Sequence, residues 1–574
     1  MNFYREYLDR VNYLDNYIDS VDRWMIKDES SPYFNTCSTF DMLREANESS
    51  YAGFAARLYC CKDSKYYMSE KMLDFIIVMC RAELSKMHED GTLDLLSTNF
   101  FTPEQFGLNA LSCGALDLKK FLSERDASPL EREALDIMKL TASRLADGCA
   151  LGGFHTPNHR WISTSAMLLT CELLDGVGCE KYYETANKFM AEGIDCDDMG
   201  EFSERSAGMY NVHCDAVFLN IYQLTGKREY LDAVCRNLEL MEYYINDDFS
   251  MYTQNSRRKD KGEVGSAQKF MKATTYYADL YFSHYLMAAY LTGNDRYAMI
   301  AKRIADNAMA RGRRVGFNHM TWMKDTLDVY TREFNIDGLS MKSEYEIFQP
   351  RSNIVRRRKG GVTYTFLANN PNFLQIEGLG IKAGVRLCAS FFAVAQFVPD
   401  EVEKTDNGYK MTMRAHGEYK LPLDAPDGTT SDYWSIDYSK RKRVHATDLS
   451  MTVSAVFCDG GVDLNVKIDG CDNVPVKVEI ATTPGLLCEV GETAMITRSG
   501  ANVLGKSGGA RFESPHGGVM TVDGLVCKHM YFESMRGSLS PVDGAFTLYL
   551  TDFSPIDHNI SIRVKKCNGV RNFN

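Results

Sequence analysis

The sequence lacks long hydrophobic runs and an apolar leader. No stretch of about 18 uninterrupted apolar residues occurs, so no membrane-spanning helix is predicted. The N-terminus, MNFYREYLDRVNYLDNY, is charged and amphipathic and has no apolar segment of the kind that a secretory signal requires. We therefore expect a cytoplasmic protein that does not bind membranes.

The sequence also lacks CxxC pairs and an excess of positive charge. Its 17 cysteines are scattered, which together with the missing leader predicts reduced thiols. No dense group of His, Cys and Asp has the usual ligand spacing, so neither metal nor cofactor is predicted, although a structural zinc or calcium ion stays open. The net charge of -12 argues against a nucleic-acid partner. The composition gives no information on the oligomeric state.

Two regions with different sequence patterns follow one another along the 574 residues. Residues 1–343 show the periodicity of successive helices. Residues 344–574 contain short alternating segments such as GGVTYTFLANN and DLNVKIDG between Gly, Asp and Asn, which is typical of an antiparallel β-sandwich. The predicted fold class is therefore a multidomain α+β protein, helical first and β-sandwich second. A further boundary near Gly485 stays open.

A hairpin pattern repeats in the helical region. Leu224-Thr225-Gly226 precedes Tyr230, and Leu291-Thr292-Gly293 precedes Tyr297, with an amphipathic run after each tyrosine. Repeated helical hairpins stack into solenoids or close into toroids. The long loops between copies favour an (α/α) toroid with a cleft on its loop side.

Three hydrogen-bond donors precede an apolar stretch in FHTPNHRW. Pro157 disfavours helix just before it, and a helix is expected after Trp161. Asn158, His159 and Arg160 thus lie at a loop-to-helix junction, where they would suit an anionic oxygen. The alternative is that Asn158 caps the helix while Trp161 packs in the core.

A second polar segment, GEFSERSAGMYN, contains Glu204, Arg205 and Tyr210 before another expected helix. Tyr210 and His213 are three residues apart, so on a helix they share one face. A tyrosine acts as a base only where nearby cations favour its phenolate form. Arginine or histidine side chains would supply them if two successive hairpins adjoin; otherwise Tyr210 is a packing residue.

These two segments resemble the heparinase II/III-like polysaccharide lyases and their alginate lyase relatives. The likeness consists of Asn-His before a helix, a Glu-Arg-Ser segment, and a tyrosine 52 residues after Asn158 (210 minus 158). The order of toroid and β-sheets also resembles that family. The segment DLLSTNF with Asn99, followed by Gln105, is similar to a substrate-cleft loop of these proteins.

The resemblance implies β-elimination in a uronate-containing oligo- or polysaccharide. Asn158 and His159 would neutralise the uronate carboxylate, as the donors of an oxyanion hole do. Tyr210 would remove the C5 proton and, in a syn elimination, return it to the leaving oxygen. The residues expected to bind substrate are Asn99, Gln105, Arg160, Glu204 and Arg205.

Related lyases take a further His or Tyr from the later part of the chain. His416, in MTMRAHGEY, is the candidate that we predict as catalytic. Tyr438 and His319 are its rivals, and each of the three also suits a structural role. Two basic runs, Arg356–Lys359 and Lys440–Arg443, could bind glycan, but charged strand edges that resist aggregation are the preferred interpretation.

Two other function classes compete with the lyase. A glycoside hydrolase needs two carboxylates on opposite sides of the bond, whereas Asp197, Asp198, Glu201 and Glu204 all cluster in one loop. A hydrolase also gives no reason for the Asn-His pair and the tyrosine. The third class is a non-catalytic glycan-binding protein that kept the fold. The sequence does not identify the glycan.

Overall fold

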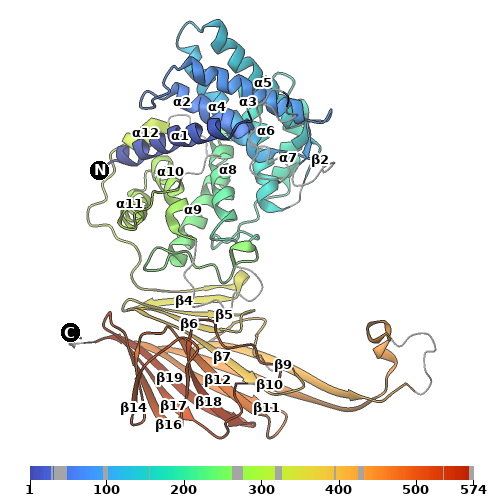
Figure 1. The fold of residues 1–574 in the computed structure, drawn as a ribbon, viewed down its shortest axis with the longest axis vertical. Helices are drawn as coiled ribbons and strands as arrows, with labels where there is room; N and C mark the ends of the chain where they lie inside the picture. Colours follow the sequence, from blue (N-terminus) through green and yellow to red (C-terminus); the bar gives the residue numbers. More distant parts are fainter. Residues whose placement is uncertain are drawn as a thin grey trace. The chain divides into compact units, whose positions relative to one another are not determined.

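The computed structural model describes residues 1–26, 30, 48–94, 101–153, 156–261, 276–316, 326–393, 396–423, 432–533 and 535–567. The chain divides into two compact units. One consists of Met1–Asp260 and Thr275–Met341, and the other contains Lys342–Asn574. The first is helical and the second is built of sheets (Figure 1), so the predicted fold class is confirmed.

Alternate helices of the first unit line its interior. Each packs on the next but one along the chain: α2 on α4, α4 on α6, α6 on α8, and α8 on α10. These helices are buried on nearly all sides, as expected of segments that are apolar around their whole circumference. The inner helices are α2 (Glu48–Cys60), α4 (Gln105–Ser123), α6 (Pro157–Leu173), α8 (Tyr210–Thr225) and α10 (Phe282–Thr292).

The other helices form an outer layer, and each packs against the inner helix that precedes it. They are more amphipathic, because only one face is buried. The outer helices are α3 (Glu70–Lys86), α5 (Pro129–Ala150), α7 (Glu180–Ala191), α9 (Arg228–Tyr244) and α11 (Asp295–Ala310). A short pair of strands, β1 (Leu93–Asp94) and β2 (Phe101–Thr102), lies between α3 and α4.

Two further helices close the ring. Helix α12 (Thr326–Thr331) packs on α10 and on α1 (Tyr4–Trp24), and α1 packs on α2. The repeated hairpin turn has a simple basis: Gly226 and Gly293 end α8 and α10 in the left-handed conformation, with φ of 69° and 72°. A residue without Cβ adopts that conformation at no steric cost, so each Thr-Gly turn ends an inner helix and begins an outer one.

The second unit consists of two sheets. Within the described residues, the larger has nine strands, all antiparallel, in the order β14-β13-β16-β17-β19-β11-β10-β9-β8. Their bounds are β14 (Thr493–Ile496), β13 (Leu487–Val490), β16 (Ser507–Glu513), β17 (Gly518–Val526), β19 (Ile556–Lys566), β11 (Gly461–Asp469), β10 (Arg443–Cys458), β9 (Gly408–Lys420) and β8 (Glu403–Thr405).

The other sheet has eight described strands, in the order β15-β18-β12-β7-β6-β5-β4-β3, and only the β15–β18 pair is parallel. Their bounds are β15 (Asn502–Leu504), β18 (Phe546–Phe553), β12 (Pro475–Thr482), β7 (Ile381–Ala389), β6 (Leu374–Gly378), β5 (Val362–Leu367), β4 (Ile354–Lys359) and β3 (Tyr345–Gln349).

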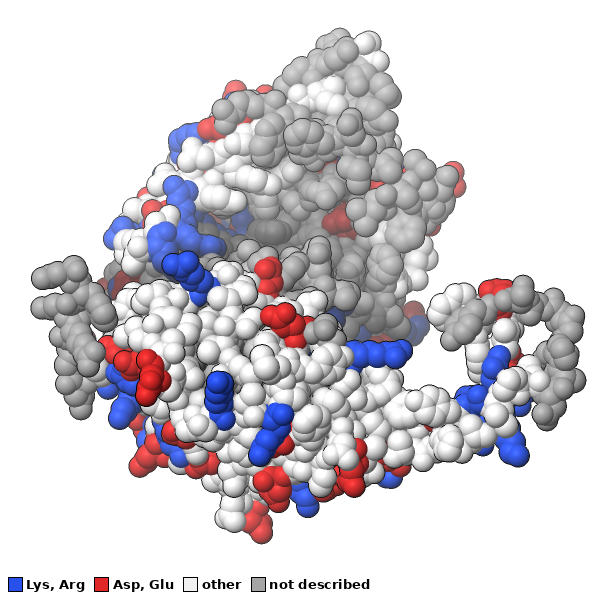
Figure 2. All heavy atoms as spheres, turned by 60° about the horizontal axis from the view of Figure 1, so that its bottom comes forward, with Lys and Arg blue, Asp and Glu red and all other residues white. Residues whose placement is uncertain are grey.

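One apolar core joins the two sheets. It includes Val453 and Ile562 from the larger sheet and Val385 and Ile480 from the smaller one. Figure 2 shows acidic and basic side chains interspersed over the surface of the sandwich. Gly485 lies inside this unit, between β12 and β13, which belong to different sheets of the same sandwich.

In the portions of the chain that the structure describes, no helix combines the length and the apolar character needed to cross a bilayer.

Burial on β10 predicts how two identical truncations differ. Val453 is fully buried, whereas Val456 is 44% exposed three residues later on the same strand. Val453→Ala should lower the free energy of unfolding by about 2 kcal/mol, because two buried methyl groups are lost and a cavity remains. Val456→Ala should change it by less than about 0.5 kcal/mol. Urea unfolding of both variants tests this, and equal midpoints would contradict the assignment of the core face.

Candidate active site

The candidate site is built around the N-terminal end of α6. Pro157 occupies the first turn, and Thr156 makes no side-chain cap. The acceptor comes instead from a distant loop: the backbone N–H of Asn158 donates to Glu204 Oε2 over 3.0 Å. A carboxylate at a helix N-terminus is favoured by the helix dipole and satisfies an otherwise open N–H group.

The same carboxylate holds an arginine over Tyr210. Arg258 Nη1 lies 2.6 Å from Glu204 Oε1, and the guanidinium lies 4.4 Å from the centre of the Tyr210 ring. Burial raises the pKa of Glu204, while the Arg258 charge and the Asn158 N–H lower it. Glu204 thus links Asn158, Arg258 and, through the arginine, Tyr210.

Hydrogen bonds join the loop that contains Arg205 to the loop that contains Arg258. The Arg257 N–H donates to the Arg205 carbonyl over 3.0 Å, and the Gly208 N–H donates to Asp260 Oδ2 over 2.9 Å. Ser206 Oγ accepts from the Tyr210 N–H at the start of α8. These bonds fix the backbone on both sides of the Tyr210–Arg258 contact. Arg205 itself adopts a left-handed conformation, with φ of 46°.

His159 is held by α4. Gln105 Nε2 donates to His159 Nδ1 over 2.5 Å, and the Phe106 ring packs edge-on against the imidazole at 5.3 Å. Burial, and secondly the Arg258 charge, lower the pKa of His159, so the ring is neutral near pH 7. With the Gln105 amide nitrogen facing it, Nδ1 is assigned as the acceptor and the single ring proton is assigned to Nε2.

Two further histidines lie deeper in the helical unit. The His213 ring lies 6.0 Å from Phe106 and 6.3 Å from Tyr210. Burial and then His159 lower the pKa of His213 to about 4, and burial and then His213 lower that of His284 to about 3. Both rings are therefore neutral, and His284 is fully buried on α10.

Asn158 itself is fully buried. Its Oδ1 accepts from Thr156 Oγ1 over 2.9 Å, whereas Nδ2 has no acceptor among the described residues. A buried amide donor without an acceptor costs about 1–3 kcal/mol. This cost would be recovered if a ligand oxygen reached Nδ2.

A cavity of about 360 Å³ opens beside His159. Its polar lining includes Gln105, His159, Arg160 and Ser163. The Arg160 guanidinium is already engaged: it donates to Glu192 Oε2 over 2.7 Å and to Asp195 Oδ1 over 3.2 Å. Arg160 thus borders the cavity while its charge is balanced by carboxylates of its own unit.

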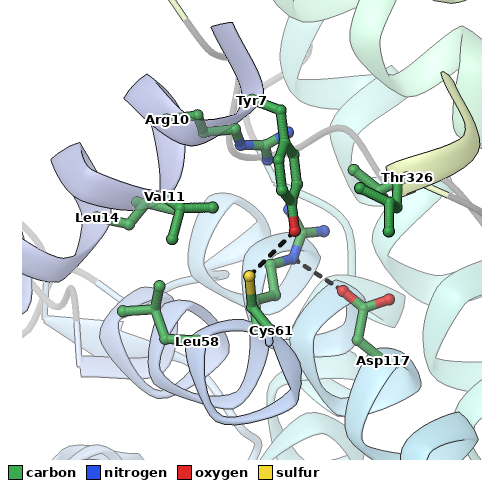
Figure 3. Close-up of a pocket in the computed structure, with 10 residues that line it drawn as sticks. Tyr7, Arg10, Val11, Leu14, Leu58, Cys61, Asp117 and Thr326 are labelled. Atoms are coloured by element: carbon green, nitrogen blue, oxygen red, sulfur yellow. Dashed lines mark hydrogen bonds and ion pairs between the residues drawn. The ribbon is translucent and has the colours of Figure 1, made fainter. Parts of the chain in front are cut away.

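A second cavity lies between α1, α2, α4 and α12 (Figure 3). Its volume is about 100 Å³, and it contains none of the predicted site residues. Tyr7 Oη and Cys61 Sγ lie 3.0 Å apart, and Arg57 Nε lies 3.4 Å from Asp117 Oδ2. Its polar groups therefore already interact with one another, and its smaller volume favours the cavity beside His159 as the place for a ligand.

The remaining predicted residues lie elsewhere. Asn99 and His319 fall outside the described residues. His416 is in the second unit, exposed on β9, with Nδ1 2.7 Å from Asp448 Oδ1 and Nε2 3.5 Å from Glu418 Oε2. Hydrogen bonds to Asp448 and then Glu418 raise the pKa of His416. Its catalytic role stays a prediction.

Two of the carboxylates considered for a hydrolase, Asp197 and Glu201, have internal partners. Glu201 is buried, and its Oε1 accepts from Tyr244 and Asn255 over 3.4 and 3.3 Å. Asp197 Oδ1 accepts from the Met199 and Glu201 N–H groups. Both carboxylates therefore brace their own loop.

Sequence reasoning missed Arg258 and His284. Arg258 lies in a long loop, TQNSRRK, that shows no periodicity, and only the contact with Glu204 identifies it. His284 lies on an apolar helix where a single histidine gives no signal. No group of three or more His, Cys, Asp or Glu side chains within the described ranges could hold a metal ion.

Comparison with known proteins shows a shared fold and no match in sequence. No protein-family model and no curated protein sequence matches this chain. Among solved structures, a heparinase III is 10% identical over 96% of this chain and 82% of its own, with a TM-score of 0.50. A Paenibacillus xanthan lyase and a Streptomyces coelicolor A3 chondroitin AC lyase are each 10% identical. They align with 99% and 98% of this chain, with TM-scores of 0.55 and 0.54.

The chain shares the fold of these lyases. It spans 57% of the xanthan lyase chain and 80% of the chondroitin AC lyase chain. The fold resemblance stated from the sequence is confirmed, although the identity is too low to transfer a substrate.

Glu104, which caps α4 beside Gln105, predicts a pH effect on stability. It accepts from the Gly107 N–H over 2.5 Å, and burial raises its pKa to about 7, offset by that N–H and reinforced by Glu48. A carboxyl group whose pKa is raised in the folded state stabilises the fold at pH values below its ordinary pKa of 4.5. This contribution to the free energy of unfolding is lost as the pH rises through about 7.

Glu104→Gln should therefore lose less stability than the parent between pH 4.5 and 7, because the amide still accepts from Gly107 but does not ionise. Thermal unfolding across that range measures the difference. Glu133→Gln, at an exposed carboxylate, is the control and should follow the parent. Parallel curves for parent and Glu104→Gln would refute the assignment.

Proposed function

We propose that the chain is a polysaccharide lyase that cleaves a uronate-containing glycan by β-elimination. The observation that carries the proposal is the group in which Glu204 joins Asn158, Arg258 and Tyr210, beside a neutral His159 that borders a cavity. The fold shared with heparinase III, xanthan lyase and chondroitin AC lyase supports it.

The first task of such a site is to neutralise the uronate carboxylate, so that C5 becomes acidic enough to lose its proton. Asn158 Nδ2 and His159 Nε2 are neutral donors that are fixed before substrate arrives. Donors preorganised in a dry site stabilise developing negative charge without the cost of reorganisation. Gln105 would act by holding the His159 proton on Nε2.

Tyr210, as phenolate, would take the C5 proton. The positive Arg258 guanidinium over its ring attracts that negative charge. The C4–O4 bond then breaks, the C4–C5 double bond forms, and the proton passes from Tyr210 to O4. His416, from the second unit, remains a predicted alternative acid for that last step. These steps use side chains alone.

The substrate class would be an acidic oligo- or polysaccharide. Glycosaminoglycans, alginate and bacterial exopolysaccharides all present a uronate, and the site does not distinguish among them. A hydrolase is the weaker candidate, since Asp197 and Glu201 are committed to internal hydrogen bonds. A cytoplasmic location stays a prediction; every described cysteine is free, which fits a reducing compartment.

Elimination has a direct optical test. Incubation with a panel of uronate glycans should raise the absorbance at about 230–235 nm, where a conjugated C4–C5 enoate absorbs.

Tyr210→Phe should lower kcat at least about a thousandfold with little change in substrate affinity, because only the proton acceptor is lost. Tyr183→Phe, at an exposed tyrosine on α7, is the matched control and should retain activity. New reducing ends without absorbance would instead indicate hydrolysis.

The proposed tautomer of His159 predicts a change in pH profile. In Gln105→Glu a carboxylate replaces the amide donor and favours the imidazolium. The His159 ionisation should then move to higher pH in the kcat/KM profile than in the parent, where burial lowers the pKa of His159. Rates of absorbance increase between about pH 5 and 8 measure it. An unchanged profile would remove Gln105 from the role of positioning residue.

A further inference from the structure

The hairpin of β9 and β10 extends beyond its sheet. The two strands pair from Tyr409–Ala455 out to Lys420–Arg443, whereas β11 pairs with β10 only as far as Ser450. The outer part, residues 414–423 and 432–449, is here called the arm. It has two strands and, among the residues that the structure describes, no third (Figure 1). A lone two-stranded hairpin is at best marginally stable, so an arm of this kind suggests a function outside the core.

One face of the arm continues the core face of the sandwich. Leu449 and Ala415 are opposite each other and buried, and further out Tyr419 is opposite His445 on the same face. The Phe392 ring packs on this face, 5.1 Å from Tyr419, which lies 6.3 Å from His445. Phe392 is 39% exposed and Tyr419 61%. A row of rings thus leads from the core into solvent.

The Phe392 ring is held there at a steric cost. Phe392 and Ala393 both adopt left-handed conformations, with φ of 45° and 61°. Such conformations are unfavourable for residues with Cβ and concentrate at functional sites. The ring fits there because residue 417 is a glycine: a Cβ at that position would lie 2.2 Å from the Phe392 ring. Packing alone does not explain the cost, since the ring stays partly exposed.

The end of the arm is rich in cations. Lys440, Arg441, Lys442 and Arg443 are consecutive, and Figure 2 shows Lys and Arg side chains along this extension. Arg443 pairs with Glu418 at 2.7 Å, and Lys440 lies 4.0 Å from Asp437. The remaining described carboxylates of the arm are Asp432, near the exposed Trp434, and Asp448 on the opposite face.

We propose that the arm is a second glycan-binding surface, on which sugar rings stack against Tyr419 and Phe392 while carboxylates of the glycan pair with Lys440, Arg441 and Lys442. Exposed aromatic rings offer large apolar faces to the C–H faces of sugars at little cost in conformational entropy. Four adjacent cations in a chain of net charge -12 are complementary to a polyanion. The anionic nature of the ligand rests on the proposed function.

The test measures binding without turnover. In a Tyr210→Phe background, affinity for hyaluronan, chondroitin sulfate, heparan sulfate and alginate polymers would be measured by calorimetry, with neutral dextran as the uncharged comparison. Tyr419→Ala should weaken binding of the preferred polyanion about tenfold, a loss of about 1.4 kcal/mol. Tyr419→Phe, which keeps the ring, should bind as the parent does.

Thr412→Ala, exposed on the opposite face of β9, is the matched control and should leave affinity unchanged. Equal affinity of Tyr419→Ala and its parent would overturn the proposal, as would equal binding of dextran. A fall in molar mass of Tyr419→Ala by light scattering would also overturn it, because the arm would then join two copies of the chain. Arm-dependent binding without any elimination would refute the lyase and leave the glycan surface standing.

Discussion

The candidate site depends on one buried carboxylate. Glu204 accepts the N–H of Asn158 at the start of α6 and pairs with Arg258, which covers Tyr210. Burying a carboxylate is costly unless charge and hydrogen bonds compensate it, and Glu204 has both. Removal of either partner would leave a buried charge poorly compensated. The geometry of Asn158 and Tyr210 is thus coupled through a residue that need not touch substrate.

The histidines near this carboxylate are neutral. His159, His213 and His284 all have lowered pKa values, chiefly because they are buried. The site therefore combines neutral hydrogen-bond donors with the Arg258 guanidinium, which is paired with Glu204. That combination suits stabilisation of charge that develops during a reaction, more than tight binding of charge that is already present.

Local rules were enough to predict much of the fold. The Thr-Gly turns ahead of Tyr230 and Tyr297 correctly predicted helical hairpins, because left-handed glycines end α8 and α10 there. The alternation of apolar and polar residues after residue 344 correctly predicted β-strands. What local rules could not supply is a partner from a distant loop. Arg258 had no pattern of its own, and the contacts of Glu204 with the Asn158 N–H and with Arg258 could not be read from the sequence. The strand pattern of β9 likewise could not show that its outer end has only one neighbour.

The bonds that build the site join residues far apart in the chain. Asn158 and Glu204 are 46 residues apart, Gly208 and Asp260 are 52, and Gln105 and His159 are 54. Each bond therefore connects one hairpin to another. Contacts of this range form only after the loops between them have closed, which makes them late events in folding. The site cannot take shape within a single hairpin, and its assembly would report that α4, α6 and α8 have already stacked.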